Sequence, residues 1–130
     1  MEERNQKIKI AIIDDSETSR RAIEDILVDQ GYKVVGNYSN GTDALKDLQS
    51  SGANLFIIDV VMPGASGIEV AKIINEKTLN SKIIMMSSLK SENIVLEAIS
   101  NGALDFINKP FQRIDLIKSV EKIESEWGRD

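Results

Sequence analysis

The run Asn54-Leu55-Phe56-Ile57-Ile58-Asp59 is the most informative stretch of this chain, because four consecutive apolar residues lead directly into a carboxylate. Short apolar runs between helical patterns are typical of parallel strands that are buried on both faces. Three other runs also end in polar groups: residues 10–13 before Asp14-Asp15, 83–86 before Ser87-Ser88, and 104–108 before Lys109-Pro110. Sites in open parallel α/β sheets form at the carboxyl ends of the strands. We therefore expect three carboxylates, a hydroxyl and an ammonium group to meet at one edge.

Helical patterns alternate with these strands along the whole chain. The sequence predicts strands over residues 7–13, 33–38, 54–59, 81–86 and 104–108, and helices over 17–30, 42–49, 66–76, 91–101 and 113–127. Right-handed crossovers and short connections favour an α/β fold with a doubly wound, five-stranded parallel sheet. We expect a single domain over residues 7–127, with loose termini at 1–6 and 128–130.

Composition excludes several classes of function. The 130 residues include no cysteine and no histidine, and 16 basic against 21 acidic residues give a net charge of −5. This balance is the opposite of that in most nucleic-acid-binding proteins. A zinc site is not expected without Cys or His ligands, and no apolar run approaches the length of a membrane span. The absence of cysteine fits a reducing compartment, so we expect a cytoplasmic protein.

The polar groups at the strand ends suggest phosphoryl chemistry. Asp14, Asp15 and Asp59 in one cleft would repel one another unless a cation such as Mg²⁺, which prefers oxygen ligands, were bound. A carboxylate also acts as a nucleophile in enzymes that form an aspartyl phosphate. Such a transfer needs mainly positioning and stabilisation of the charge on the phosphoryl oxygens. Magnesium and the Lys109 ammonium would supply positive charge, and the Ser87 hydroxyl would supply a hydrogen bond.

These residues also match a known family in order and spacing. The chain resembles the receiver domain of two-component response regulators over roughly residues 7–126. Asp14-Asp15 is similar to the acidic pair of that family, and residues 59–67 (DVVMPGASG) are similar to its phosphoacceptor loop. Ser87 stands at the switch hydroxyl position, Phe106 at the aromatic switch position, and residues 109–111 match a Lys-Pro-Phe signature.

The resemblance implies a flavodoxin-like sheet of strand order 2-1-3-4-5 and a role for each site residue. Asp59 is the implied phosphoacceptor, with Lys109 and Ser87 as the groups that contact the phosphoryl oxygens. The implied metal ligands are Asp14, Asp15, Asp59 and the backbone carbonyl of Val61, with Mg²⁺ as the cofactor and Mn²⁺ as the alternative ion.

The resemblance also implies partners and a stand-alone receiver of the chemotaxis-regulator type. A histidine kinase or histidine phosphotransfer protein would donate the phosphoryl group, which fits the absence of histidine here. The receiver would catalyse its own phosphorylation and dephosphorylation. Ser87 and Phe106 would then change the face formed by the fourth helix, the fifth strand and the fifth helix, where a target protein binds. We expect neither direct nucleic-acid binding nor membrane insertion.

Three residues depart from the family pattern. Ser88 replaces the usual Ala or Gly, while Val61 and Leu89, two residues beyond Asp59 and Ser87, are both apolar. In the family these two positions influence the rate of dephosphorylation. Our hypothesis is that two apolar side chains exclude attacking water and lengthen the lifetime of the phosphorylated form.

The residues also admit less specific interpretations. Ser87 alone is more typical of a helix cap, and Phe106 serves equally as a core residue. Arg20-Arg21 is typical of a solvated helix face, with docking of a kinase as the alternative. The alternative function is a receiver-like module that binds proteins without being phosphorylated. Such modules usually lack part of the acidic pair, the acceptor or the lysine, all of which are present in this chain.

Overall fold

The computed structural model describes residues 7–78, 80–89 and 91–127. These residues form alternating strands and helices in the predicted order. The strands are β1 (Lys9–Ile13), β2 (Lys33–Tyr38), β3 (Leu55–Asp59), β4 (Lys82–Ser87) and β5 (Ala103–Asn108). The helices are α1 (Glu17–Asp29), α2 (Gly41–Lys46), α3 (Gly67–Lys77), α4 (Glu92–Ser100) and α5 (Arg113–Trp127).

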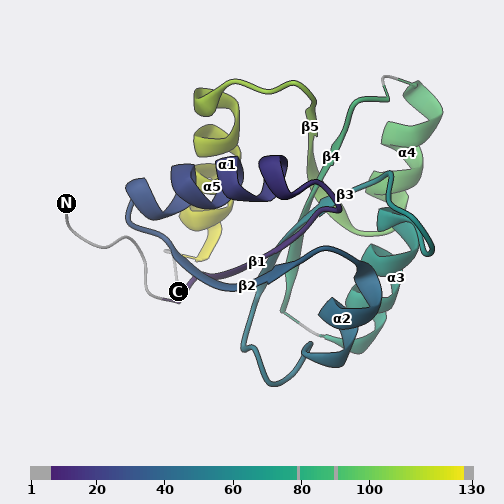
Figure 1. Ribbon diagram of the computed structural model, residues 1–130, viewed down its shortest axis with the longest axis horizontal. Coiled ribbons are helices and arrows are strands. Elements are labelled where there is room, and N and C mark those ends of the chain that lie inside the picture. The colour runs from purple at the N-terminus through teal and green to yellow at the C-terminus, as the bar shows by residue number, and fades with distance from the viewer. Residues whose placement is uncertain (1–6, 79, 90, 128–130) are drawn as a thin grey trace.

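The five strands form one parallel sheet of order β2-β1-β3-β4-β5, so the predicted fold class and strand order are confirmed. Figure 1 shows α1 and α5 on one face of the sheet and α2, α3 and α4 on the other. Because all strands run in the same direction, the segments that follow β1, β3, β4 and β5 emerge at the same edge. The site residues predicted from the sequence lie in or next to these segments.

Alternate residues of the central strands supply the two halves of the core. Ile10 and Ile12 of β1 pack with α1 and α5, whereas Ala11 and Ile13 pack on the face covered by α2, α3 and α4. The period of two follows from the strand geometry, in which successive side chains point to opposite faces. Burial on both faces explains why β1 and β3 read as continuous apolar runs, and it fixes their carboxyl ends firmly.

Side chains at the helix starts fix most of the element boundaries. The Ser66 hydroxyl accepts a hydrogen bond from the Glu69 N–H at 3.3 Å, as the capping spacing predicts. The prediction for the second helix was wrong at its end, because α2 stops at Lys46 and not at Gln49. A turn follows α2, with the Ser51 N–H bonded to the carbonyl of Asp47 at 2.9 Å. The other boundaries differ by at most two residues from those predicted.

The predicted loose termini, 1–6 and 128–130, lie outside the described residues, and the domain limits 7–127 stay a prediction. Within the part of the chain that the structure describes, no helix is both long enough and apolar enough to span a bilayer.

Candidate functional site

Three carboxylates converge where β1 and β3 end. Asp14, Asp15 and Asp59 each offer one oxygen, and these oxygens all lie within 4.8 Å of one another. Asp14 is 1% exposed and Asp59 is 8% exposed, whereas Asp15 faces solvent. The parallel topology thus brings together two segments that are 45 residues apart, as the sequence predicts.

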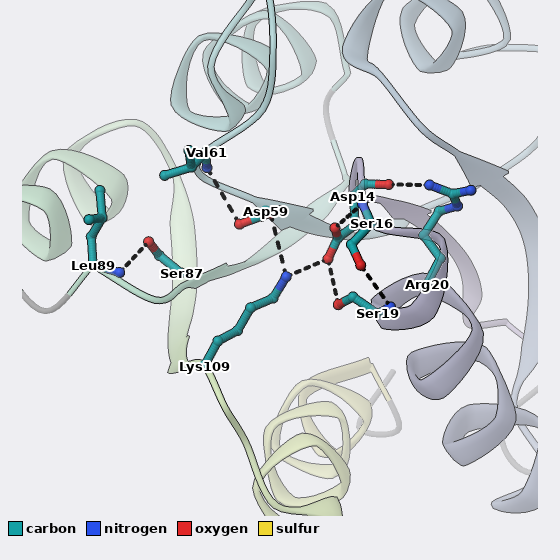
Figure 2. Close-up of polar contacts among 9 residues, drawn as sticks. All are labelled: Asp14, Ser16, Ser19, Arg20, Asp59, Val61, Ser87, Leu89 and Lys109. Atoms are coloured by element: carbon teal, nitrogen blue, oxygen red, sulfur yellow. Dashed lines mark hydrogen bonds and ion pairs between the residues drawn. The ribbon is translucent and has the colours of Figure 1, made fainter.

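Lys109 supplies a positive charge between the two buried carboxylates. Its ammonium lies 2.6 Å from Asp14 Oδ2 and 3.4 Å from Asp59 Oδ2 (Figure 2). The residue follows β5 directly, where its backbone N–H donates to the carbonyl of Ser87 at 2.8 Å. The Lys109–Pro110 peptide bond is cis. The ammonium therefore belongs to the same site as the carboxylates.

The beginning of α1 holds Asp14 at several points that the sequence did not indicate. Asp14 Oδ1 accepts the backbone N–H of Ser16 at 2.9 Å, and Oδ2 accepts the hydroxyl of Ser19 at 2.7 Å. The guanidinium of Arg20 donates to the Asp14 carbonyl oxygen at 2.6 Å (Figure 2). The interpretation of Arg20 as part of a solvated face was therefore wrong. Its partly buried side chain ties α1 to the end of β1, while Arg21 is exposed as expected.

The surroundings of Asp59 disfavour its charged form. Burial is the largest influence and raises the pKa of this carboxyl, and the negative charge of Asp14 adds to the rise. The Lys109 ammonium and the Val61 N–H, which lies 3.4 Å from Asp59 Oδ1, act in the opposite direction. The pKa remains raised overall, so one lysine does not fully compensate for the buried negative charge.

Ser87 and Phe106 belong to the neighbouring strands β4 and β5, and Ser87 is the last residue of β4, the strand next to β3. Ser87 is fully buried and its Oγ accepts the backbone N–H of Leu89 at 2.9 Å. It does not cap α4, because Ser91 occupies that position. Phe106 is half-buried and packs against the core on the α4 side of the sheet, in register with Met85 of β4. This contact gives Phe106 a core role.

The three residues that depart from the family pattern all border solvent near the site. Val61 is 51% exposed and Leu89 is 45% exposed, and Ser88 is also exposed. Figure 2 shows Val61 and Leu89 flanking Asp59 and Ser87. In Figure 2 Val61 lies next to the Asp59 carboxylate, and Leu89 lies beyond Ser87 as seen from that carboxylate.

The donor set suits a hard divalent cation. The cluster offers oxygen ligands only, and two of its carboxylates are buried around a single ammonium. Magnesium typically takes one or two carboxylates and completes its shell with water and phosphate oxygens. The raised pKa of Asp59 points to the same conclusion, because a cation would relieve the excess negative charge.

Comparison with known proteins assigns this arrangement to a family. The profile of the response regulator receiver domain matches residues 10–121. The chain belongs to this receiver domain family. The chemotaxis protein CheY of Bacillus subtilis is 36% identical over 114 residues, which cover 88% of this chain and 95% of that protein. CheY of Thermotoga maritima is 34% identical over 115 residues, covering 88% and 96%.

Solved receiver structures agree with this assignment. The response regulator domain of Thermotoga maritima CheB superposes with a TM-score of 0.79 at 34% identity, covering 91% of this chain and 94% of that one. A CheX–CheY–BeF3–Mg complex from Borrelia burgdorferi gives a TM-score of 0.84 at 25% identity, covering 89% and 88%. The receiver domain described here is thus of the CheY type, a phosphoaccepting switch of two-component signalling. Receiver domains bind Mg²⁺ through such an aspartate cluster.

Proposed function

We propose that Asp59 is the residue that accepts the phosphoryl group in this receiver. The observation that carries the proposal is the position of its carboxylate at the end of β3, beside an ammonium and two further carboxylates. Asp14 is committed to contacts with Ser16, Ser19 and Lys109. Among the described residues, Asp59 accepts one long backbone hydrogen bond besides its ion pair with Lys109, so its oxygens have fewer partners than those of Asp14.

The proposed metal ligands are Asp14, Asp15, Asp59 and the backbone carbonyl of Val61, with Mg²⁺ as the ion and Mn²⁺ as an alternative of similar ligand preference. When bound, the ion supplies positive charge to the oxygens of the transferring group. The excess of carboxylates over ammonium groups in the cluster supports this assignment.

The transfer itself requires little from the protein beyond positioning. One oxygen of Asp59 attacks phosphorus, and an O–P bond forms as the P–N bond to the donor's histidine breaks. The donor is a histidine kinase or a histidine phosphotransfer protein, since this chain holds no histidine of its own. Lys109 lies 3.4 Å from Asp59 and within reach of an oxygen of the new phosphoryl group.

Ser87 and Phe106 form the proposed link from Asp59 to the surface. The Ser87 oxygen accepts from Leu89, so its own O–H proton remains to be donated to a phosphoryl oxygen. Movement of Ser87 would shift the residues after β4 and let Phe106 turn inward beneath α4. A shift between 1:99 and 99:1 requires about 5.5 kcal/mol. Two or three charge-assisted hydrogen bonds, at about 1.5–3 kcal/mol each, supply a bias of this size.

The proposed target site is the face formed by α4, β5 and α5. Three large apolar side chains on α4 and β5 are exposed there: Leu96 (62%), Ile99 (53%) and Leu104 (45%). Apolar groups exposed in this way are typical of protein–protein contacts. We also place the protein in the cytoplasm, a location that the absence of cysteine supports.

The test is the intact mass after incubation with acetyl phosphate or phosphoramidate and Mg²⁺, with Asp59→Asn as the matched variant. We expect the addition of one phosphoryl group that is labile to hydroxylamine, requires Mg²⁺ and is absent in Asp59→Asn. Modification of the variant to the same extent would assign the acceptor elsewhere. If neither protein were modified by small donors or by a phosphorylated histidine domain, the phosphorylation-independent binding module would be favoured.

A further inference from the structure

Two donors converge on a single oxygen of Asp14. Oδ2 accepts the Lys109 ammonium at 2.6 Å and the Ser19 hydroxyl at 2.7 Å, while Oδ1 accepts the Ser16 N–H at 2.9 Å. A carboxylate has about four acceptor positions, so Ser19 and Lys109 occupy both positions of Oδ2. Figure 2 shows that they approach this oxygen from different elements, Ser19 from α1 and Lys109 from the end of β5.

The proposed function requires Lys109, but not Ser19, to change its hydrogen-bond partner. Lys109 has to exchange Asp14 for a phosphoryl oxygen, whereas the proposed function gives the Ser19 hydroxyl no partner other than Asp14. Asp14 is 1% exposed, so water does not readily replace a lost donor. A buried carboxylate that loses its charged partner is strongly disfavoured unless other hydrogen bonds remain. The hydroxyl of Ser19 is the side-chain donor that stays when the ammonium leaves.

We propose that Ser19 is a positioning residue whose hydroxyl holds the Asp14 carboxylate in the orientation that binds Mg²⁺ and releases Lys109. The inference rests on the proposed function and extends it to a residue outside the acidic cluster. With the hydroxyl in place, Asp14 stays anchored to α1 while Lys109 exchanges partners. Without it, the Asp14 carboxylate would turn with the ammonium and would no longer be oriented to hold Mg²⁺.

The contribution of Ser19 to α1 can be separated from this role. Its backbone N–H donates to the Ser16 hydroxyl at 3.2 Å, as part of the helix cap. An alanine at position 19 keeps this N–H and removes only the side-chain hydroxyl. Thr18 offers a matched control, because its exposed side chain carries a hydroxyl on the same turn and is not part of the hydrogen bonds to Asp14.

The test is the Mg²⁺ dissociation constant, measured by calorimetry for the wild type and for Ser19→Ala, Ser19→Thr and Thr18→Ala. Residues that orient metal ligands typically change affinity by 10- to 100-fold when they are replaced. We expect Ser19→Ala to weaken binding by roughly tenfold. Ser19→Thr, which keeps a hydroxyl, should recover most of this loss, and Thr18→Ala should bind as the wild type does. Urea unfolding without metal checks that each variant is folded.

A second comparison tests whether Ser19 and Lys109 act on the same oxygen. In a Lys109→Met background, Ser19 is the remaining side-chain donor to Asp14 Oδ2 among the described contacts. Removal of its hydroxyl should therefore weaken Mg²⁺ binding by a larger factor than in the wild type. Residues that share one partner show such non-additive behaviour in double-mutant cycles.

The outcomes separate this inference from the proposed function. Wild-type protein that binds Mg²⁺, together with Ser19→Ala that binds equally well, would overturn the role of Ser19 and leave the metal site intact. An equal loss in Ser19→Ala and Ser19→Thr would also overturn it, because the hydroxyl would then not be the cause. A wild-type protein with no affinity for Mg²⁺ would overturn both proposals.

Discussion

Asp59, which we propose as the phosphoacceptor, lies in an environment that is unfavourable for its negative charge. Its folded-state pKa is raised, chiefly by burial, so the folded protein holds this proton more tightly than the unfolded chain does. Folding stability therefore falls as the pH rises from about 3.8 through the raised pKa, and the loss persists at neutral pH. The carboxylate that we propose as the phosphoacceptor thus destabilises the metal-free fold.

We predict that Asp59→Asn stabilises the metal-free protein at pH 7, because burial raises the pKa of the carboxyl and the amide is not ionised. The difference in stability between Asp59→Asn and the wild type should shrink as the pH is lowered, and it should vanish below the ordinary pKa of an aspartate side chain. Urea unfolding of both proteins across this range in EDTA measures the difference. The exposed Asp25→Asn serves as control and should change stability by less than about 0.5 kcal/mol at either pH. An Asp59→Asn variant less stable than wild type at pH 7 would contradict the argument.

Lys109 contacts both Asp14 and Asp59, the proposed acceptor. We predict that Lys109→Ala still accepts some phosphoryl group, because the carboxylates that bind the metal remain, but loses most of the conformational response. The measurement is the change in NMR chemical shifts at Phe106 and along α4 when beryllium fluoride and Mg²⁺ are added. Shifts of wild-type size in Lys109→Ala would show that the ammonium does not transmit the signal.

The sequence predicted the main residues of the site but not their hydrogen-bond partners. Asp14, Asp59 and Lys109 follow apolar runs, so their convergence results from topology alone. Ser19 and Arg20 carry no such signal, because their contacts with Asp14 depend on how α1 is oriented and on individual rotamers. The spacing from Asp14 to Ser19 is compatible with a capped helix start in many proteins, and it becomes informative only once the distance of 2.7 Å is known.

At the scale of elements, the start of α3 fits closely against the end of β3. Gly67 donates its N–H to the carbonyl of Val60, and a β-carbon at position 67 would lie 2.0 Å from the carbonyl oxygen of Asp59. The atoms in close contact belong to the backbone, which cannot change its rotamer to relieve the clash as a flexible side chain could. The position of the acceptor carboxylate therefore depends on a residue without a side chain at the beginning of the next helix.

We predict that Gly67→Ala destabilises the protein by about 2–3 kcal/mol and impairs phosphorylation, since either α3 or the end of β3 must move. Thermal unfolding and the acetyl phosphate reaction measure the two effects. Gly64→Ala is the matched control in the same loop. Gly64 has a φ of +80° but no atom within 4 Å of an added β-carbon. Gly64→Ala should therefore lower the free energy of unfolding by about 1 kcal/mol and leave the Asp59 carboxylate in place. Equal effects of the two substitutions would contradict the contact argument.

The loops after β3 and β4 carry the two apolar side chains beside the acceptor, Val61 and Leu89. We predict that Val61→Asn and Leu89→Glu each accelerate loss of the phosphoryl group several-fold, because polar side chains admit and orient water where apolar ones exclude it. The decay of the phosphorylated mass in EDTA-quenched time courses measures this rate. A wild-type lifetime that is already short, or variants that decay no faster, would count against the hypothesis.

Element boundaries were less predictable than element order. The two-sided burial of β1, β3 and β4 leaves a clear apolar run in the sequence, whereas α2 is short and its end depends on a local turn. Asn54, predicted as the first residue of a strand, lies just before β3 and bonds the neighbouring backbone with its own backbone and with its side chain. Its Oδ1 accepts the N–H of Lys9 at 2.9 Å, and its Nδ2 donates to the carbonyl of Lys7 at 2.6 Å. Such side-chain contacts with a neighbouring strand are not encoded in hydrophobic periodicity.

At the scale of the whole molecule, the site and the fold are thermodynamically linked. The carboxyl ends of the strands gather buried negative charge, and the same strands form the centre of the core. Any cation that binds the folded cluster and not the unfolded chain stabilises the entire domain. The sole tryptophan, Trp127, reports on this global equilibrium, because its ring lies at the end of α5, 5.5 Å from the ammonium of Lys82 at the start of β4.

We predict that Mg²⁺ at roughly 100 times its dissociation constant stabilises the protein by about 2.7 kcal/mol, and that EDTA abolishes this gain. Urea unfolding followed by Trp127 fluorescence measures the effect across a magnesium titration, in which stability should rise with the logarithm of concentration as expected for one site.

Asp15→Asn is the informative variant, because Asp15 is exposed and its replacement removes a proposed ligand with little cost to the metal-free fold. It should unfold as the wild type does in EDTA but gain much less from Mg²⁺. An equal gain would mean that the stabilising ion binds elsewhere, because a cation held by the three carboxylates must depend on the one that faces solvent.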